Sequence, residues 1–258
     1  MLLVVDAGNS QTEVGLFDED KIIGQWRVVT TNYRTRDELH ILLSMLLHSI
    51  GVSRKDIRGC CIASVVPHLN SSLQQACEHT FGLEPLMVEP GIKTGIILQC
   101  DNPKEVGADR IANAAGARAQ CTDAMIIIDF GTATTFDVMT EKAEWLGGLI
   151  LPGVQLSADA LFEHCARLPR VPIKAPRSAI GKDTVTNIQA GLTYGYADMV
   201  DGLVTRITGE MGVPLYVIAT GGLSRAIASV ATRIDCVDPL LTLKGLCAIY
   251  ERNLGKIK

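Results

Sequence analysis

Short apolar runs alternate with longer segments of helical periodicity along the whole of this 258-residue chain. Runs with the length and residue types of strands cover 1–5, 13–17, 22–29, 60–66 and 85–88, and then 125–129, 134–139, 144–150, 215–219 and 234–237. Apolar residues at helical spacing predict helices over 36–50, 69–81, 106–120, 154–165, 186–211, 224–231 and 242–253. Strands mixed with helices in this way predict an α/β fold.

The order of the predicted elements repeats. Each half opens with a strand, continues through two more strands of a meander, and then adds helices and further short strands. Two corresponding aspartates, Asp6 and Asp129, are 129 − 6 = 123 residues apart, which is close to half of the chain. We therefore expect a duplicated unit, with halves at 1–117 and 118–258 that face one another across a cleft. The last helix is expected to cross back to the first half.

Composition narrows the class of protein. The hydrophobic fraction is 47% and the aromatic fraction is 5%, so the expected core is mainly aliphatic. The net charge is −4 with no basic stripe, so neither a nucleic-acid partner nor an anionic membrane surface is expected. The apolar runs are far shorter than a membrane span, and the first residues form a strand rather than a secretory signal.

The eight cysteines and five histidines are scattered along the chain. No pair of cysteines has the C-x-x-C spacing, and most cysteines lie in apolar contexts, where a thiol behaves as a small hydrophobic group. His40 and His48 share one predicted helix but are eight residues apart, with no acidic or cysteine partner beside them. We expect a cytoplasmic protein with reduced thiols and no zinc-type site.

Two aspartates stand where an apolar strand ends and a glycine turn begins. Asp6 is followed by Gly8 and Asp129 by Gly131, and hydroxyl residues come after each turn. Glycine lets the backbone approach phosphate groups closely, and a carboxylate suits the metal ion that accompanies them. One such turn is also typical of an Asx-turn after a strand. Its repetition favours the binding of a nucleotide.

Other nucleotide motifs are absent or open to two interpretations. The segment Ile180-Gly-Lys-Asp-Thr184 lacks the first glycine of a P-loop and has Asp183 where a hydroxyl residue should follow the lysine. No G-x-G-x-x-G motif follows a strand, which argues against a dinucleotide fold. The turn Thr220-Gly-Gly222 is consistent with contact to adenine or ribose, and equally with a tight strand-to-helix turn.

A kinase that phosphorylates an alcohol usually needs a base. The best candidate is Asp109, in the first turn of the predicted helix 106–120 and next to Arg110, whose guanidinium suits a carboxylate or phosphate. The helix dipole also favours an acid at this position without any function, and Asp109 and Arg110 would then be a surface pair. Spacing alone leaves both interpretations open.

Several motifs then occur in one order. They are Asp6-Ala-Gly-Asn-Ser10, Ser64-Val-Val-Pro67, Asn102-Pro-Lys-Glu-Val-Gly-Ala-Asp-Arg110, Asp129-Phe-Gly-Thr-Ala-Thr-Thr-Phe-Asp137, Gly147-Gly-Leu-Ile-Leu-Pro-Gly153 and Thr220-Gly-Gly222. Together they resemble the type III pantothenate kinases, of the acetate and sugar kinase/Hsp70/actin superfamily, over essentially the whole chain. The resemblance implies a duplicated RNase H-like (actin-like ATPase) fold, with two similar halves around a nucleotide cleft.

The resemblance also implies an activity. It is the ATP-dependent phosphorylation of the primary hydroxyl of pantothenate to 4'-phosphopantothenate, the first step of coenzyme A biosynthesis. Members of the family that resemble this chain are homodimers that need a monovalent cation, K⁺ or NH₄⁺, alongside Mg²⁺. The glycines in the long helix over 186–211 fit close packing between two subunits.

The matching motifs assign roles to particular positions. ATP is expected to contact Thr132 and the first loop, which consists of Asp6, Ala7, Gly8, Asn9, Ser10, Gln11, Thr12 and Glu13. Asp129 corresponds to the monovalent-cation ligand, and Asp6 is expected to hold Mg²⁺ through the phosphates or water. Pantothenate is expected to contact Gly107, Ala108, Asp109, Arg110 and Thr184, with Asp109 as the base.

One position departs from the family pattern. Cys100 stands where the family commonly has a tyrosine that touches the substrate. A thiol has neither the reach nor the hydrogen bond of a phenol, so we expect altered surroundings for pantothenate. Two alternative functions stay open, another small-molecule kinase of the superfamily and a non-catalytic regulator of transcription like the Bvg accessory factors.

Overall fold

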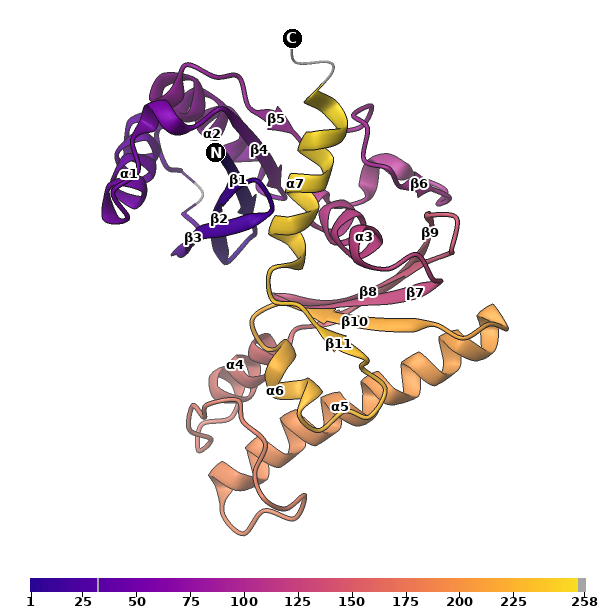
Figure 1. The fold of residues 1–258 in the computed structure, drawn as a ribbon. Helices are drawn as coiled ribbons and strands as arrows, with labels where there is room; N and C mark the ends of the chain where they lie inside the picture. Colours follow the sequence, from indigo (N-terminus) through magenta and orange to yellow (C-terminus); the bar gives the residue numbers. More distant parts are fainter. Residues whose placement is uncertain (32, 255–258) are drawn as a thin grey trace. The chain divides into compact units, whose positions relative to one another are not determined.

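The computed structural model describes residues 1–31 and 33–254, and they divide into two compact units. Unit 1 consists of Met1–Ile96, Asp101–Gln120 and the C-terminal segment from Leu241. Unit 2 consists of Ile97–Cys100 and Cys121–Leu240. Each unit is built on its own β-sheet, and each is described separately below (Figure 1).

Unit 1 contains a five-stranded sheet in the order β3-β2-β1-β4-β5. Strand β2 pairs antiparallel with β1 and β3, whereas β4 pairs parallel with both β1 and β5. The carboxyl ends of β1 and β4 therefore lie at the same edge of the sheet. The strands are β1 (Leu2–Ala7), β2 (Gln11–Asp18), β3 (Lys21–Val29), β4 (Gly59–Ser64) and β5 (Leu86–Met87).

Helices cover both faces of this sheet (Figure 1). Helices α1 (Arg36–Ser49) and α2 (Pro67–Phe81) bury leucines such as Leu43 and Leu73 against Leu3 and Val5 of β1. Helices α3 (Ala108–Gln120) and α7 (Leu241–Asn253) pack on the other face. Short 3₁₀ turns at Arg54–Asp56 and Pro103–Glu105 complete the unit.

Helices α3 and α7 approach one another unusually closely at two glycines. A Cβ atom at Gly245 would stand 1.8 Å from the carbonyl oxygen of Ala112, and one at Gly116 would stand 2.3 Å from that of Leu241. Beside this crossing, the hydroxyl of Thr242 donates a hydrogen bond of 2.6 Å to the side-chain oxygen of Asn113. The position of α3 is therefore determined by backbone contact with α7.

Unit 2 contains a six-stranded sheet in the order β11-β10-β7-β8-β9-β6. Helices α4 (Val154–His164), α5 (Thr184–Met211) and α6 (Ser224–Ala228) contribute to one apolar core with the sheet, in which Phe130 and Phe136 are fully buried. The strands are β6 (Ile97–Leu98), β7 (Met125–Phe130), β8 (Ala133–Met139), β9 (Glu144–Pro152), β10 (Tyr216–Thr220) and β11 (Cys236–Val237).

The two sheets repeat one topology. The order β3-β2-β1-β4-β5 in unit 1 matches β9-β8-β7-β10-β11 in unit 2, with the same antiparallel and parallel pairs. The predicted duplicated α/β fold is therefore confirmed. The sequence halves 1–117 and 118–258 stay a prediction. The compact units have other boundaries than these halves, because α7 belongs to unit 1.

The predicted elements are present with small shifts at their ends. The helix predicted from residue 106 begins at Ala108, because Pro103–Glu105 forms a 3₁₀ turn and Val106 is extended. Helix α5 begins two residues before its predicted start, since the carboxylate of Asp183 accepts a hydrogen bond of 2.9 Å from the Thr186 amide and caps the helix. All eight cysteines are free thiols. Over the part of the chain that the structure describes, no helix is both long and apolar enough to cross a bilayer.

Candidate functional site

In unit 1, Asp6 lies at the carboxyl end of β1, between Glu13 of β2 and Ala63 of β4. The loop that follows is a tight turn, in which the amide of Gly8 donates a hydrogen bond of 3.1 Å to the carbonyl of Gln11. The Thr30 hydroxyl donates to the Gly8 carbonyl at 2.7 Å, so the residue that follows β3 supports the turn from one side. The predicted phosphate loop is thus a braced β-hairpin with its acid at the base.

The same edge of the sheet carries Asp109. The amide of Val65, the residue after β4, donates a hydrogen bond of 3.0 Å to the carbonyl of Ala7. The Cβ position of Gly107 is 3.5 Å from Cγ1 of Val65 and only 2.4 Å from Oδ1 of Asp109. Any side chain at residue 107 would displace this carboxylate. The structure therefore brings the Asp6 loop and the start of α3 together around Val65.

The carboxylate of Asp109 is held in a defined orientation and has altered acidity. Its Oδ1 accepts a hydrogen bond of 2.8 Å from the backbone amide of Arg110. Burial raises the pKa of Asp109, and the hydrogen bond and the charge of Arg110 oppose that rise in part. A carboxylate with a raised pKa binds a proton more readily than an exposed one, which suits a general base.

In unit 2, Asp129 takes the place in β7 that Asp6 takes in β1. Its neighbours across the sheet are Thr135 of β8 and Thr220 of β10. The Cβ position of Gly221, which has φ of +89°, is 2.5 Å from Oδ1 of Asp129, and that of Gly131 is 3.4 Å from the same atom. Two glycine turns therefore enclose this half-buried carboxylate.

The oxygen atoms around Asp129 fit a cation. The Thr135 hydroxyl oxygen is buried and has no hydrogen-bond partner in the described part of the chain, and directly paired residues on neighbouring strands project from the same face of the sheet. Carboxylate and hydroxyl oxygens are ligands that hard cations prefer. The described residues contain no group of three His, Cys, Asp or Glu side chains that could hold a metal ion, so hydroxyl, backbone or phosphate oxygens would complete the coordination.

Thr132 lies in the exposed turn between β7 and β8. The amide of Gly153 donates a hydrogen bond of 3.1 Å to the Thr132 carbonyl, and a Cβ atom at Gly153 would stand 2.2 Å from that oxygen. The turn therefore rests directly on the junction of β9 and α4. We did not predict this role of Gly153 from the sequence, although the segment Gly147-Gly-Leu-Ile-Leu-Pro-Gly153 was one signal for it.

Two of the residues predicted to contact pantothenate, Cys100 and Thr184, belong to unit 2. Cys100 is half-buried just after β6, and Thr184 is the exposed first residue of α5. Gly107, Asp109 and Arg110 belong to unit 1. The grouping of these residues with Ala108 in one substrate site stays a prediction. The turn at Gly221 is a tight strand-to-helix turn against Asp129, and contact of this turn with adenine or ribose, the other interpretation of the motif, stays open.

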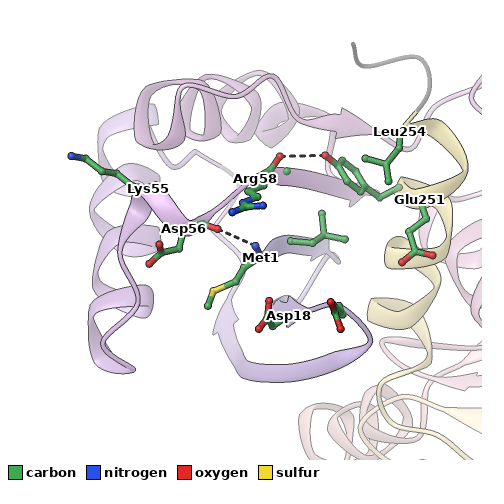
Figure 2. Close-up of a pocket in the computed structure, with 11 residues that line it drawn as sticks. Met1, Asp18, Lys55, Asp56, Arg58, Glu251 and Leu254 are labelled. Carbon is green, nitrogen blue, oxygen red and sulfur yellow. Dashed lines mark hydrogen bonds between the residues drawn. The ribbon is translucent and has the colours of Figure 1, made fainter.

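A cavity of about 500 Å³ in unit 1 lies away from these residues (Figure 2). It is found at the amino ends of β1 and β4, whereas Asp6 and Val65 are at the carboxyl ends of these strands. Asp18 of β2, Glu251 of α7 and Arg58, which directly precedes β4, line it. This cavity is therefore not the predicted nucleotide or pantothenate site.

Comparison with known proteins gives one consistent result. A family model described as type III pantothenate kinase matches residues 2–206. A type III pantothenate kinase of Bacillus cytotoxicus is 46% identical over 253 residues, covering 98% of this chain and 97% of the relative. One of Geobacillus kaustophilus is 45% identical over 256 residues, covering 99% of each.

Solved structures with lower sequence identity share the fold. A Campylobacter jejuni protein, proposed to be a Baf family transcriptional activator, has a TM-score of 0.62 at 19% identity, with 98% of this chain and 99% of that chain covered. A Sinorhizobium meliloti protein, proposed to be a 2-dehydro-3-deoxygalactonokinase, has a TM-score of 0.62 at 11% identity, with the same coverage. These similarities support the duplicated RNase H-like fold of actin-like ATPases and sugar kinases, and they concern the fold alone.

Proposed function

The chain belongs to the type III pantothenate kinase family, and we propose that Asp109 is the general base of the reaction. That reaction is the ATP-dependent phosphorylation of pantothenate, the first step of coenzyme A biosynthesis. The observation that carries the proposal is the half-buried carboxylate of Asp109, which fills the space left by Gly107, is oriented by the Arg110 amide, and lies at the same sheet edge as the Asp6 loop. A raised pKa equips this carboxylate to accept a proton from an alcohol.

The proposed chemistry is a direct transfer. Asp109 accepts the proton of the primary hydroxyl of pantothenate while the hydroxyl oxygen attacks the γ-phosphorus of ATP. The bond between that phosphorus and the bridging oxygen of ADP breaks, and the proton on Asp109 then passes to solvent. Because phosphoryl transfer depends mainly on positioning and charge neutralisation, the turns that would hold ATP contribute to the rate together with the base.

ATP is proposed to bind through the turns at the ends of β1 and β7. The loop Asp6–Glu13 would present backbone amides to the phosphates, and Thr132 would contact the same nucleotide. The tight hairpin at Gly8 and the close approach of Gly153 to the Thr132 turn support this assignment, because both turns have defined backbone positions.

Two kinds of cation are proposed to accompany ATP. Asp129 would hold K⁺ or NH₄⁺ with nearby oxygen atoms, and Asp6 would hold Mg²⁺ through the phosphates or water. Bound cations neutralise phosphate charge. The carboxylate of Asp129 and the buried hydroxyl of Thr135 support the cation site, because they face the same side of neighbouring strands.

Pantothenate is proposed to contact Gly107, Ala108, Arg110 and Thr184 as well as Asp109. Cys100 would occupy the place of a substrate-contacting tyrosine. No nucleic acid or membrane partner is part of the proposal, and the use of ATP together with the free thiols favours the cytoplasm.

We also propose a homodimer that uses α5. Gly191, Gly195, Gly202 and Gly209 are exposed along the side of α5 opposite its buried residues, such as Val200. A Cβ atom at each of these glycines would meet no other described atom within 4 Å. Glycines on an exposed helix face permit close approach of a second helix.

The test is an assay that couples ADP release from ATP to a detectable product. We expect ADP release that requires pantothenate and increases when K⁺ replaces Na⁺. Asp109→Asn should lower the turnover by about 10² to 10⁴ while the protein stays folded. Asp123→Asn, which changes an exposed acid outside the site, should have no effect.

Other outcomes separate the alternatives. Unchanged turnover in Asp109→Asn would exclude Asp109 as the base. ADP release with a different alcohol in a panel of acceptors, but not with pantothenate, would indicate another small-molecule kinase. ATP binding without turnover on any acceptor would favour a regulatory protein.

A further inference from the structure

Tyr196 of α5 lies against the point where β9 ends and α4 begins. Its hydroxyl oxygen is 2.9 Å from the carbonyl oxygen of Pro152 and 3.3 Å from that of Gly153. The hydroxyl oxygen of Ser157, in the first turns of α4, is 2.6 Å from the same Tyr196 oxygen. The long helix is thereby joined to the end of a strand and the start of another helix.

The single proton of the phenol determines the direction of these hydrogen bonds. Tyr196 donates its proton toward the Pro152 carbonyl, with a weaker share to Gly153, because carbonyl oxygens only accept. Ser157 must then donate to Tyr196. The Gly153 carbonyl also accepts from the Ser157 amide at 2.9 Å, so the constraint that depends on Tyr196 alone is the one on Pro152.

This junction supports the turn that contains Thr132. Pro152 pairs with Ala133, the residue that follows Thr132. The Cβ position of Gly153 is 2.2 Å from the Thr132 carbonyl oxygen and 2.6 Å from that of Gly131. A shift of Pro152 or Gly153 by a few tenths of an ångström therefore moves the backbone of the Gly131–Thr132 turn.

We infer that Tyr196 is a positioning residue for the nucleotide, which acts through Pro152 and Gly153 on the Gly131–Thr132 turn. The inference rests on the proposed function in one respect, namely that this turn contacts ATP. Tyr196 itself touches neither substrate in the proposal. Its phenol keeps the turn in the position that accepts the nucleotide phosphates, so its loss affects ATP and not pantothenate.

The test compares Tyr196→Phe with Tyr194→Phe. Tyr194 is the matched control, because it lies on the same helix and its hydroxyl also donates to a backbone carbonyl, that of Pro176 at 2.7 Å. The free energy of one hydrogen bond predicts a rise in the KM for ATP of roughly three- to tenfold in Tyr196→Phe. The KM for pantothenate should stay within about twofold of wild type, and Tyr194→Phe should leave both KM values unchanged.

Two further variants, Ser157→Ala and its combination with Tyr196→Phe, test the same hydrogen bonds. Ser157→Ala should raise the KM for ATP in the same direction, and its effect combined with Tyr196→Phe should be less than additive. If Tyr196→Phe fails to fold, Ser157→Ala alone carries the test. An unchanged KM for ATP in the tested variant, or equal rises in both KM values, would overturn the inference.

Direct binding separates this inference from the proposed function. The Kd of the non-hydrolysable analogue adenosine 5′-(β,γ-imido)triphosphate is measured by calorimetry for wild type and Tyr196→Phe. A weaker Kd in the variant supports the positioning role even if wild type does not phosphorylate pantothenate. The same Kd in both proteins contradicts it, and so does the absence of binding to wild type.

Discussion

At the scale of single residues, the position of the candidate base, Asp109, depends on Gly107, two residues before it. The carboxylate oxygen of Asp109 occupies the space where a side chain at residue 107 would lie. The Arg110 amide then orients the carboxylate, and burial raises its pKa. The expected base is thus a carboxylate that the fold keeps partly away from water, and this has a measurable cost in stability.

That cost predicts how stability depends on pH. The pKa of Asp109 is higher in the folded than in the unfolded protein, so its contribution to stability is present below the unfolded-state pKa and is lost as the pH rises through the folded-state pKa. We expect Asp109→Asn to have a higher free energy of unfolding than wild type at about pH 8. The advantage should shrink toward about pH 4.

Urea unfolding of the two proteins across this pH range checks the expectation. Asp123→Asn is the control, because its carboxylate is exposed and should show no such pH-dependent difference. An Asp109→Asn variant that is less stable than wild type at about pH 8 would show that the ionised carboxylate is stabilised by the fold.

At the scale of elements, α3 carries Asp109 and is held against α7 by contact between backbones. This crossing has no room for a methyl group at Gly245, whose Cβ would stand 1.8 Å from the Ala112 carbonyl oxygen. Because α7 is the last element of the chain and α3 lies near its middle, the base is positioned by a contact between distant segments. The sequence offers glycine at both positions but does not pair them.

We predict that Gly245→Ala lowers the free energy of unfolding by roughly 1–3 kcal/mol, because the two helices must separate to admit the methyl group. An isolated helix would instead gain stability of about 1 kcal/mol from the same change. Denaturant unfolding decides between the two signs. The exposed substitution Glu251→Ala on the same helix should change stability by less than about 0.5 kcal/mol, and a more stable Gly245→Ala would mean that the crossing is looser.

At the scale of the whole molecule, the duplicated sheets give each unit an aspartate near the end of a corresponding strand, β1 in unit 1 and β7 in unit 2. Unit 1 holds Asp6 and Asp109 at one sheet edge, and unit 2 holds Asp129 between two glycine turns. The exposed glycines of α5 add a surface for a second copy of the chain. The residues proposed for catalysis and ATP binding therefore come from both units, and the surface proposed for assembly is on α5 of unit 2.

The proposed dimer makes Gly195→Leu informative. Leucine favours the helix more than glycine, so α5 should persist, while the larger side chain should block close approach of a second helix. We expect light scattering to show a monomer for Gly195→Leu and a dimer for wild type. Glu78→Leu adds an exposed leucine to α2 and should stay dimeric, and a dimeric Gly195→Leu would place the interface elsewhere.

The elements, their duplication and the residues that carry the resemblance to type III pantothenate kinases could all be predicted from the sequence. These features depend on local periodicity and on motifs of adjacent residues, which a single sequence displays directly. The tertiary structure was needed to show that Gly107 makes room for Asp109 and that Gly221 lies against Asp129. The same is true of Tyr196, which reaches Pro152 across 44 residues of sequence. Such contacts arise from packing between segments that are far apart in the chain, and no local pattern of apolar and polar residues encodes them.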